Sequence, residues 1–176
     1  MRLFVRLSLL GLVALVAVGF WLNGKQGTPE PEAKASVQSG QCLESGISVV
    51  VDFGTSNANR TIEKCVSNFT GNSWNLLITA GFDARGTEKY PEAFVCRINM
   101  VPDLKSEKCI STPGTTNGSW AYFLAEPGTD SWVYSPYGAA SHKAICGSAE
   151  GWRFLAPDEQ IQTPPTIKPV TTSCEK

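Results

Sequence analysis

Alternating apolar and β-branched residues predict several short β-strands in the central part of the chain. The clearest run is Ile-Ser-Val-Val-Val-Asp-Phe, at residues 47–53. The polar stretch at residues 55–60 then predicts a turn. Shorter runs of the same kind predict further strands at residues 61–67, 93–99 and 150–154.

A short helix is predicted between the second and third of these strands. Residues 74–80 are mostly apolar, and Asn72 or Ser73 precedes them as an N-cap that can accept a bond from a free backbone N–H. Gly81 follows at the position where helices often end. With three or four strands after the helix, this order predicts an α+β domain, in which a small mixed β-sheet carries one helix on one face.

An aromatic hairpin is predicted after the third strand. Six aromatic residues lie within residues 117–137, and a Pro-Gly turn divides this stretch into two strand-like runs. Alternation places Trp120 and Tyr122 on one face of the first run, and Trp132 and Tyr134 on one face of the second. The candidate ligand-binding residues are Trp120, Tyr122, Trp132, Tyr134 and Tyr137.

These rings have two interpretations. Rings on an exposed strand face can stack against a sugar or a corrinoid, or enter a pocket of a protein partner. Alternatively, a small domain needs large side chains in its core, and the rings pack over the helix residues Leu76, Leu77 and Ala80. Tyr134 and Tyr137 lie beside a proline and are the two rings most expected at the surface.

The flanking segments differ from the central part in composition. Residues 1–23 contain a nearly uninterrupted apolar run behind Arg2 and Arg6, which is typical of a membrane anchor or of a cleaved signal peptide. The two arginines favour a cytoplasmic N-terminus and place the remainder outside, anchored to the cell membrane or secreted. We favour the uncleaved anchor, because no small-residue cleavage site directly follows the run. Beyond it we expect a flexible linker at residues 24–40, a folded domain at 41–155 and a Pro-rich tail at 156–176.

Six cysteines follow the apolar segment, and this even number indicates disulfide bonds and an oxidising compartment. Many pairings are possible. One pair closes a short loop across a turn, a second lies where two antiparallel strands would meet, and the third would fasten the tail to the domain. The favoured pairing is therefore Cys96–Cys109, Cys42–Cys65 and Cys146–Cys174. No C-x2-C pair is present and the chain has one histidine, so we expect no metal site.

Charge and motif content narrow the function further. Residues 41–176 carry 11 Lys and Arg against 14 Asp and Glu, which argues against nucleic-acid binding. His142 has no nucleophile motif around it, so we expect no catalysis. Asp52 is expected to pair with Arg97 or Arg153 as a structural ion pair. No motif indicates a resident cofactor.

Several landmarks in this order resemble a known family. They are Gly-Ile-Ser-Val-Val-Val-Asp-Phe-Gly (46–54), a helix ending Ala-Gly-Phe (80–82), Phe-Val-Cys-Arg-Ile-Asn (94–99), Ser-Trp-Ala-Tyr (119–122), Trp-Val-Tyr (132–134), Gly-Ala (138–139) and Glu-Gly-Trp (150–152). The set is similar to secreted actinobacterial proteins with the small β-grasp-like domain that also forms the C-terminal domain of transcobalamin and intrinsic factor. The resemblance implies a one-helix β-grasp-like fold and a non-enzymatic binding or surface role.

In the cobalamin carriers this domain is one of two that enclose a corrinoid. The resemblance makes cobalamin a candidate ligand. It covers only the smaller domain, and without the larger one a face of the corrinoid would stay in water. We therefore expect a membrane-tethered or secreted, non-catalytic binding module that acts outside the cytoplasm. The alternative is a structural or adhesive cell-surface protein that contacts another protein or the cell wall. A pocket lined by Trp and Tyr would favour the first function, and a flat exposed aromatic ridge the second.

Overall fold

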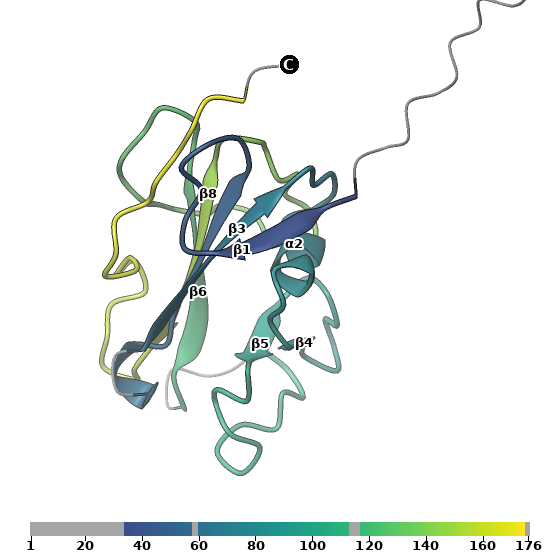
Figure 1. Ribbon diagram of the computed structural model, residues 1–176. Helices are drawn as coiled ribbons and strands as arrows, with labels where there is room; N and C mark the ends of the chain where they lie inside the picture. Colours follow the sequence, from purple (N-terminus) through teal and green to yellow (C-terminus); the bar gives the residue numbers. More distant parts are fainter. Residues whose placement is uncertain (1–33, 58–59, 113–116, 175–176) are drawn as a thin grey trace, which may run out of the picture. The chain divides into compact units, whose positions relative to one another are not determined.

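A six-stranded mixed sheet forms the centre of the protein in the computed structural model (Figure 1), which describes residues 34–57, 60–112 and 117–174. The strands lie in the order β1-β3-β2-β8-β6-β7. Their bounds are β1 Ser36–Ser39, β2 Ile47–Asp52, β3 Thr61–Ser67, β6 Ser119–Ala125, β7 Val133–Tyr134 and β8 Ala149–Leu155. The expected anchor at residues 1–23 lies outside the described residues.

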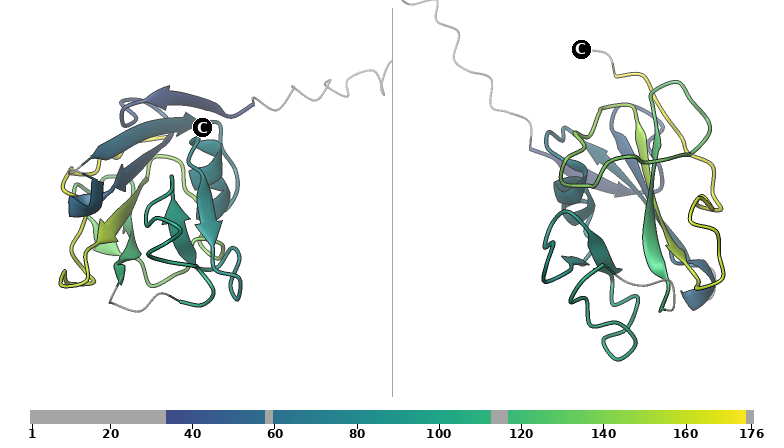
Figure 2. Two further views of the ribbon diagram at one scale, coloured as in Figure 1. Left: turned by 90° about the horizontal axis from the view of Figure 1, so that it is seen from below. Right: turned by 180° about the vertical axis from the view of Figure 1, so that it is seen from behind.

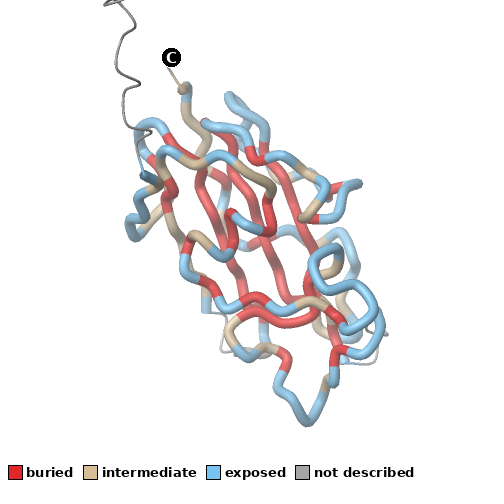
Figure 3. Tube along the Cα trace, turned by 90° about the vertical axis from the view of Figure 1, so that its right-hand side faces the viewer, coloured by how far each residue is buried: buried red, intermediate tan, exposed pale blue. Residues whose placement is uncertain are grey.

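One parallel pair joins two antiparallel halves of this sheet. The parallel neighbours are β2 and β8, with Val51 opposite Trp152, and every other neighbouring pair is antiparallel. All seven residues of β8 are buried, as are all six residues of β2. Figure 3 shows these buried central strands, surrounded by exposed loops. The central strands are therefore covered on both faces.

The first face of the sheet packs against the helix and a small second sheet. The helix α2 spans Ser73–Thr79, and its N-cap Asn72 accepts a bond from the N–H of Asn75. Gly81 follows the helix with a φ of +91°, in the left-handed region that glycine favours. The second sheet pairs β4 (Ala84–Gly86) with β5 (Val95–Ile98), and a 3-10 turn, η1, covers Gly54–Asn57. The predicted helix and its caps are confirmed.

Alternation along the strands separates two apolar clusters. Leu76 and Leu77 of α2 are fully buried in the larger cluster, together with Val49 and Val51 of β2. This cluster fills the space between the large sheet, the helix and the small sheet. A smaller cluster on the opposite face contains Ala121, Phe123 and Leu155, with Trp132 packed against it. This arrangement is an α+β fold with one packed helix, as the sequence predicts.

The C-terminal segment covers the second face of the large sheet (Figures 1 and 2). The Ser48 hydroxyl donates to the carbonyl of Val170 at 2.8 Å, and the N–H of Thr172 donates to the carbonyl of Gly147 at 2.8 Å. Pro165 is buried against the sheet. The Pro-rich tail is thus a packed layer of the domain.

Three disulfides hold these layers together. They join Cys42 to Cys65, Cys96 to Cys109 and Cys146 to Cys174, the pairing favoured from the sequence. The last of them links the tail to the loop before β8. Because disulfides persist in oxidising environments, the domain belongs to such a compartment. Among the described residues, no helix has both the length and the apolar character needed to cross a membrane.

The linker predicted over residues 24–40 ends earlier than expected. Ser36–Ser39 form β1, an edge strand that pairs antiparallel with β3, from Ser36 opposite Ser67 to Ser39 opposite Lys64. All four residues of β1 are exposed, so their composition gave no sign of a strand. Backbone hydrogen bonds alone hold an edge strand, and a polar sequence is compatible with them.

Candidate functional site: an aromatic cleft beside strand β6

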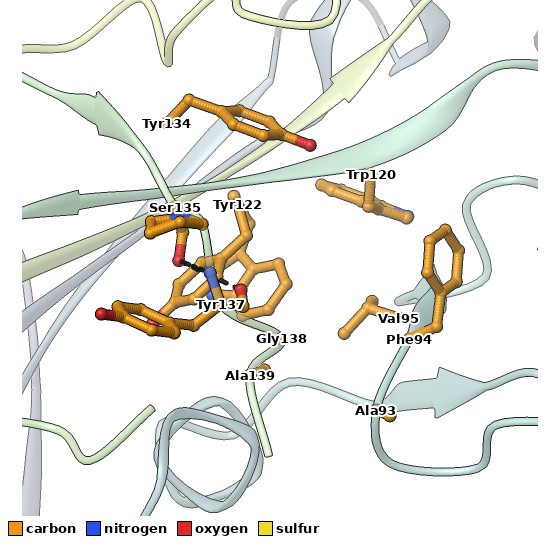
Figure 4. Close-up of a pocket in the computed structure, with 12 residues that line it drawn as sticks. Ala93, Phe94, Val95, Trp120, Tyr122, Tyr134, Ser135, Tyr137, Gly138 and Ala139 are labelled. Atoms are coloured by element: carbon orange, nitrogen blue, oxygen red, sulfur yellow. Dashed lines mark hydrogen bonds between the residues drawn. The ribbon is translucent and has the colours of Figure 1, made fainter. Parts of the chain in front are cut away.

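The strongest candidate site is a hollow of about 320 Å³, here called the aromatic cleft, between β6 and the segment at residues 134–139. Twelve residues line it (Figure 4). Its aromatic lining consists of Phe94, Trp120, Tyr122, Tyr134, Tyr137 and Trp152. The volume lies near the lower end of the roughly 300–1,000 Å³ that is typical of small-molecule sites.

Stacked rings form the inner wall of the cleft. Tyr122 and Trp152 face each other across β6 and β8, with ring centres 4.3 Å apart and planes 18° from parallel. His142 lies edge-on to Tyr122 at 6.3 Å and stacks on Tyr137 at 6.0 Å. Burial lowers the pKa of His142, so its ring is uncharged near neutral pH. The wall of the cleft is therefore apolar and carries no fixed charge.

The rim of the cleft is open to solvent. Tyr137 is 58% exposed and Tyr134 is 37% exposed, whereas Tyr122 and Trp152 are buried. Tyr134 also packs edge-on against Phe123 with ring centres 5.5 Å apart. Tyr137 is thus the most exposed aromatic ring of the cleft.

Local hydrogen bonds fix the segment that carries these tyrosines. The N–H of Ser135 donates to the carbonyl of Tyr122 at 2.8 Å, which holds the end of β7 against β6. The Ser135 hydroxyl accepts from the N–H of Tyr137 and donates to its carbonyl, both at 3.1 Å (Figure 4). A Cβ on Gly138 would lie 2.8 Å from the carbonyl oxygen of Ala93, so a glycine is needed for this close approach. The rim is therefore preorganised.

A buried carboxyl group lies behind the inner wall. Glu150 accepts from the Ser73 hydroxyl at 2.9 Å and from the Tyr122 hydroxyl at 2.9 Å, and these two hydroxyls are 2.7 Å apart. None of the ion pairs among the described residues includes Glu150. Burial raises its pKa to about 7, although the two hydroxyls oppose this shift. Burial and the neighbouring Glu150 also raise the pKa of Tyr122.

One hydrogen-bond donor of the lining has no partner. The indole N–H of Trp152 is buried and unpaired among the described residues. Leaving a buried donor unpaired costs about 1–3 kcal/mol. This nitrogen is closed to solvent, so it offers no contact to a ligand that enters the cleft.

Four of the five predicted binding residues line the cleft, and Trp132 does not. The indole N–H of Trp132 donates to the carbonyl of Ile167 at 2.8 Å, and its ring packs on the smaller apolar cluster. Trp132 therefore lies outside the aromatic cleft, under the C-terminal segment. It precedes β7, and the C-terminal segment covers it, which alternation within the hairpin did not reveal.

The structure divides the aromatic rings between the core and the surface. Trp120, Tyr122 and Trp152 belong to the larger core cluster, as the core interpretation expects. Tyr134 and Tyr137 are exposed, as the binding interpretation expects. The buried carboxyl of Glu150 was not predicted, although alternation with Trp152 and Phe154 places it on the core face.

The remaining polar candidates have structural partners. Asp52 pairs with Arg153 at 2.7 Å, one of the two partners expected from the sequence. Arg97 instead donates to the carbonyls of Pro102 and Glu107.

The sulfurs of one disulfide come close to a carboxylate. Glu107 lies beside Cys96 and Cys109, but these two sulfurs are bonded to each other and so are not available as thiolate ligands for a metal.

Comparison with known proteins adds no further guide to the site. No family model matches the chain, and no curated protein or solved structure matches it either.

Proposed function

We propose that this protein is a non-catalytic ligand-binding module that acts outside the cytoplasm, with the aromatic cleft as its binding site. The observation that carries this proposal is the exposed ring of Tyr137, held rigidly at the rim of a cleft with a stacked aromatic wall. Covering an exposed aromatic ring with a ligand is energetically favourable, and a preorganised rim reduces the conformational entropy lost on binding. The disulfides support an oxidising location.

The ligand of this module should be uncharged and should contain a ring. No charged residue lines the aromatic cleft, so the site offers no counter-ion. The resemblance to the transcobalamin C-terminal domain adds a corrinoid as a candidate and a β-grasp-like description of the fold. At about 320 Å³ the cleft would hold only one edge of a corrinoid, which agrees with a domain that forms part of a larger enclosure.

The location is part of the same proposal. The apolar run at residues 1–23 would tether the domain to the outer side of a cell membrane, or direct its secretion.

A binding role without catalysis agrees with the surroundings of His142. Its ring neighbours are Tyr122 and Tyr137, and its backbone carbonyl accepts a bond from the N–H of Ser73 at the start of α2. Neither tyrosine is placed to orient the imidazole as a base for a nucleophile. We therefore assign His142 to the support of the cleft wall.

A surface-contact role is the second candidate. Val133 is 64% exposed beside the exposed Tyr137 and Tyr134, and an apolar partner surface would bury all three. A hollow lined by Trp and Tyr favours the first role, because a flat contact surface has no need of one.

Calorimetric titration of the full-length protein with cobalamin and with cobinamide tests the proposal. We expect saturable binding that Tyr137→Ala weakens by about tenfold, in line with the loss of one stacked ring. Tyr90→Ala is the matched control, since Tyr90 is 41% exposed and does not line the cleft. Equal loss in both variants would contradict the assignment of the site, provided that both keep the wild-type melting temperature.

A further inference from the structure

A second hollow shares part of its lining with the aromatic cleft. This hairpin hollow, of about 220 Å³, is bounded by Leu124, Glu126, Thr129, Ser131 and Val133 of the β6–β7 hairpin. It shares Tyr134, Pro136 and Tyr137 with the aromatic cleft. The two hollows therefore lie next to each other, with the exposed ring of Tyr137 common to both.

The size of the hollows limits the shape of a ligand that fills both. Each lies at or below the lower end of the roughly 300–1,000 Å³ range of small-molecule sites, so each suits a single ring with its substituents. A broad macrocycle could enter neither hollow completely. Rings joined in a chain could place one unit in each hollow and cross Tyr137 between them.

The charge of the lining limits the chemistry of that ligand. No Lys, Arg or His lines either hollow, and Glu126 is the one charged residue among the lining residues. A carboxylate without a nearby cation repels anionic ligands and accepts hydrogen bonds from hydroxyl groups. The ligand should therefore not be anionic, and hydroxyl groups on it can donate to the Glu126 carboxylate.

The polar groups of the lining match such a ligand. The hairpin hollow offers the Ser131 hydroxyl and the Glu126 carboxylate, together with the Thr129 hydroxyl, which donates to the carbonyl of Glu126 and can still accept. The aromatic cleft adds the phenol groups of the exposed Tyr134 and Tyr137. A sugar ring supplies both hydroxyl donors and oxygen acceptors, and its C–H face packs against aromatic rings.

We propose that the two hollows are consecutive subsites for an uncharged oligosaccharide, with Tyr137 as the stacking residue between them. This inference rests on the proposed function, because it uses the aromatic cleft as one subsite and names the class of ligand. It predicts that affinity increases with the number of linked sugar rings, because a single ring can occupy only one subsite at a time.

The test is a calorimetric titration of the full-length protein with N-acetylglucosamine, chitobiose and chitotetraose, and with glucose, cellobiose and cellotetraose. We expect the tetrasaccharide of at least one series to bind about tenfold more tightly than its monosaccharide. Val133→Ala, in the hairpin hollow alone, should remove most of this gain. Ile161→Ala is the matched control, since Ile161 is 61% exposed, against 64% for Val133, and lines neither hollow.

The outcomes separate this inference from the proposed function. If corrinoids bind and Tyr137→Ala weakens them, while no saccharide binds, the oligosaccharide inference is overturned and the binding module stands. If saccharides bind equally well at every length, or if Val133→Ala has no more effect than Ile161→Ala, the two-subsite arrangement is overturned. If neither class of ligand gives heat or quenches tryptophan fluorescence, the proposed function fails as well.

Discussion

The hydroxyl of Tyr122 lies 2.9 Å from Oε2 of Glu150, and both groups are buried on the sheet face that packs against α2. Ser73 completes a triangle of three oxygen-bearing groups. When Glu150 is ionised, both hydroxyls donate to its carboxylate. When it is protonated, the three O–H groups can donate in a closed ring, from Glu150 to Tyr122, on to Ser73 and back to Glu150. Both protonation states are thus hydrogen-bonded, and desolvation decides between them.

This arrangement predicts a specific dependence of stability on pH. The pKa of Glu150 in the folded state is raised from 4.5 to about 7, so the folded protein holds this proton more tightly than the unfolded chain. The associated stability is complete below pH 4.5 and is lost as pH rises through about 7. At higher pH the loss approaches about 3 kcal/mol.

Urea unfolding of the wild type and of Glu150→Gln between pH 4 and pH 8.5 measures this effect. Glutamine does not titrate, so the free energy of unfolding of the wild type should fall relative to the variant as pH rises. Glu44→Gln, at an exposed position, should follow the wild type. Parallel curves for the wild type and Glu150→Gln would show that Glu150 titrates at an ordinary pKa.

The buried ion pair under the C-terminal segment predicts a large effect of a small substitution. Oδ2 of Asp52 accepts from Arg153 at 2.7 Å and from the backbone N–H and hydroxyl of Thr166, each at 2.8 Å. Asp52→Asn removes one of the two carboxylates that compensate buried Arg153, the other being Glu159, and should lower the free energy of unfolding by about 2 kcal/mol.

An exposed ion pair supplies the control for that measurement. Asp83 and Arg85 are 2.9 Å apart with half or more of each side chain in solvent, so Asp83→Asn should change stability by less than about 1 kcal/mol. Similar losses in the free energy of unfolding for Asp52→Asn and Asp83→Asn would contradict the stabilising role of the buried pair.

A tight contact beneath the tail predicts the result of adding one methyl group. A Cβ on Gly151 would lie 2.9 Å from Pro165 and 3.0 Å from the ring of Trp132. Gly151→Ala should therefore push the tail away from the sheet and destabilise the protein by about 1–3 kcal/mol, measured by urea unfolding. Wild-type stability in this variant would mean that the tail does not pack on the second face.

Much of the fold follows from local sequence patterns. Alternation and β-branched content identified β2, β3 and β8, and the Asn72 cap with Gly81 identified α2. What local patterns could not show was where distant segments meet. β1 is polar because its side chains all face solvent, and Trp132 is covered by residues more than thirty positions later. Both depend on tertiary contacts.

The candidate site was predictable to a similar extent. Local aromatic density identified Trp120, Tyr122, Tyr134 and Tyr137, which line the cleft. The Ser73–Tyr122–Glu150 triangle was not predicted, because it brings together residues from three separate elements. The sequence held one signal for Glu150. It lies two residues before Trp152 in the same strand, so its carboxyl group is on the apolar face.

The central claim is that ligand binds in the aromatic cleft, and backbone amide NMR of the isotope-labelled full chain tests it most directly. Addition of cobinamide or of chitotetraose should shift the amide signals of residues 135 and 137–139 saturably, and leave those of residues 166–172 on the tail-covered face unchanged. Shifts confined to the tail face, or no shift with either ligand at about 1 mM, would contradict the assignment of the aromatic cleft as the binding site.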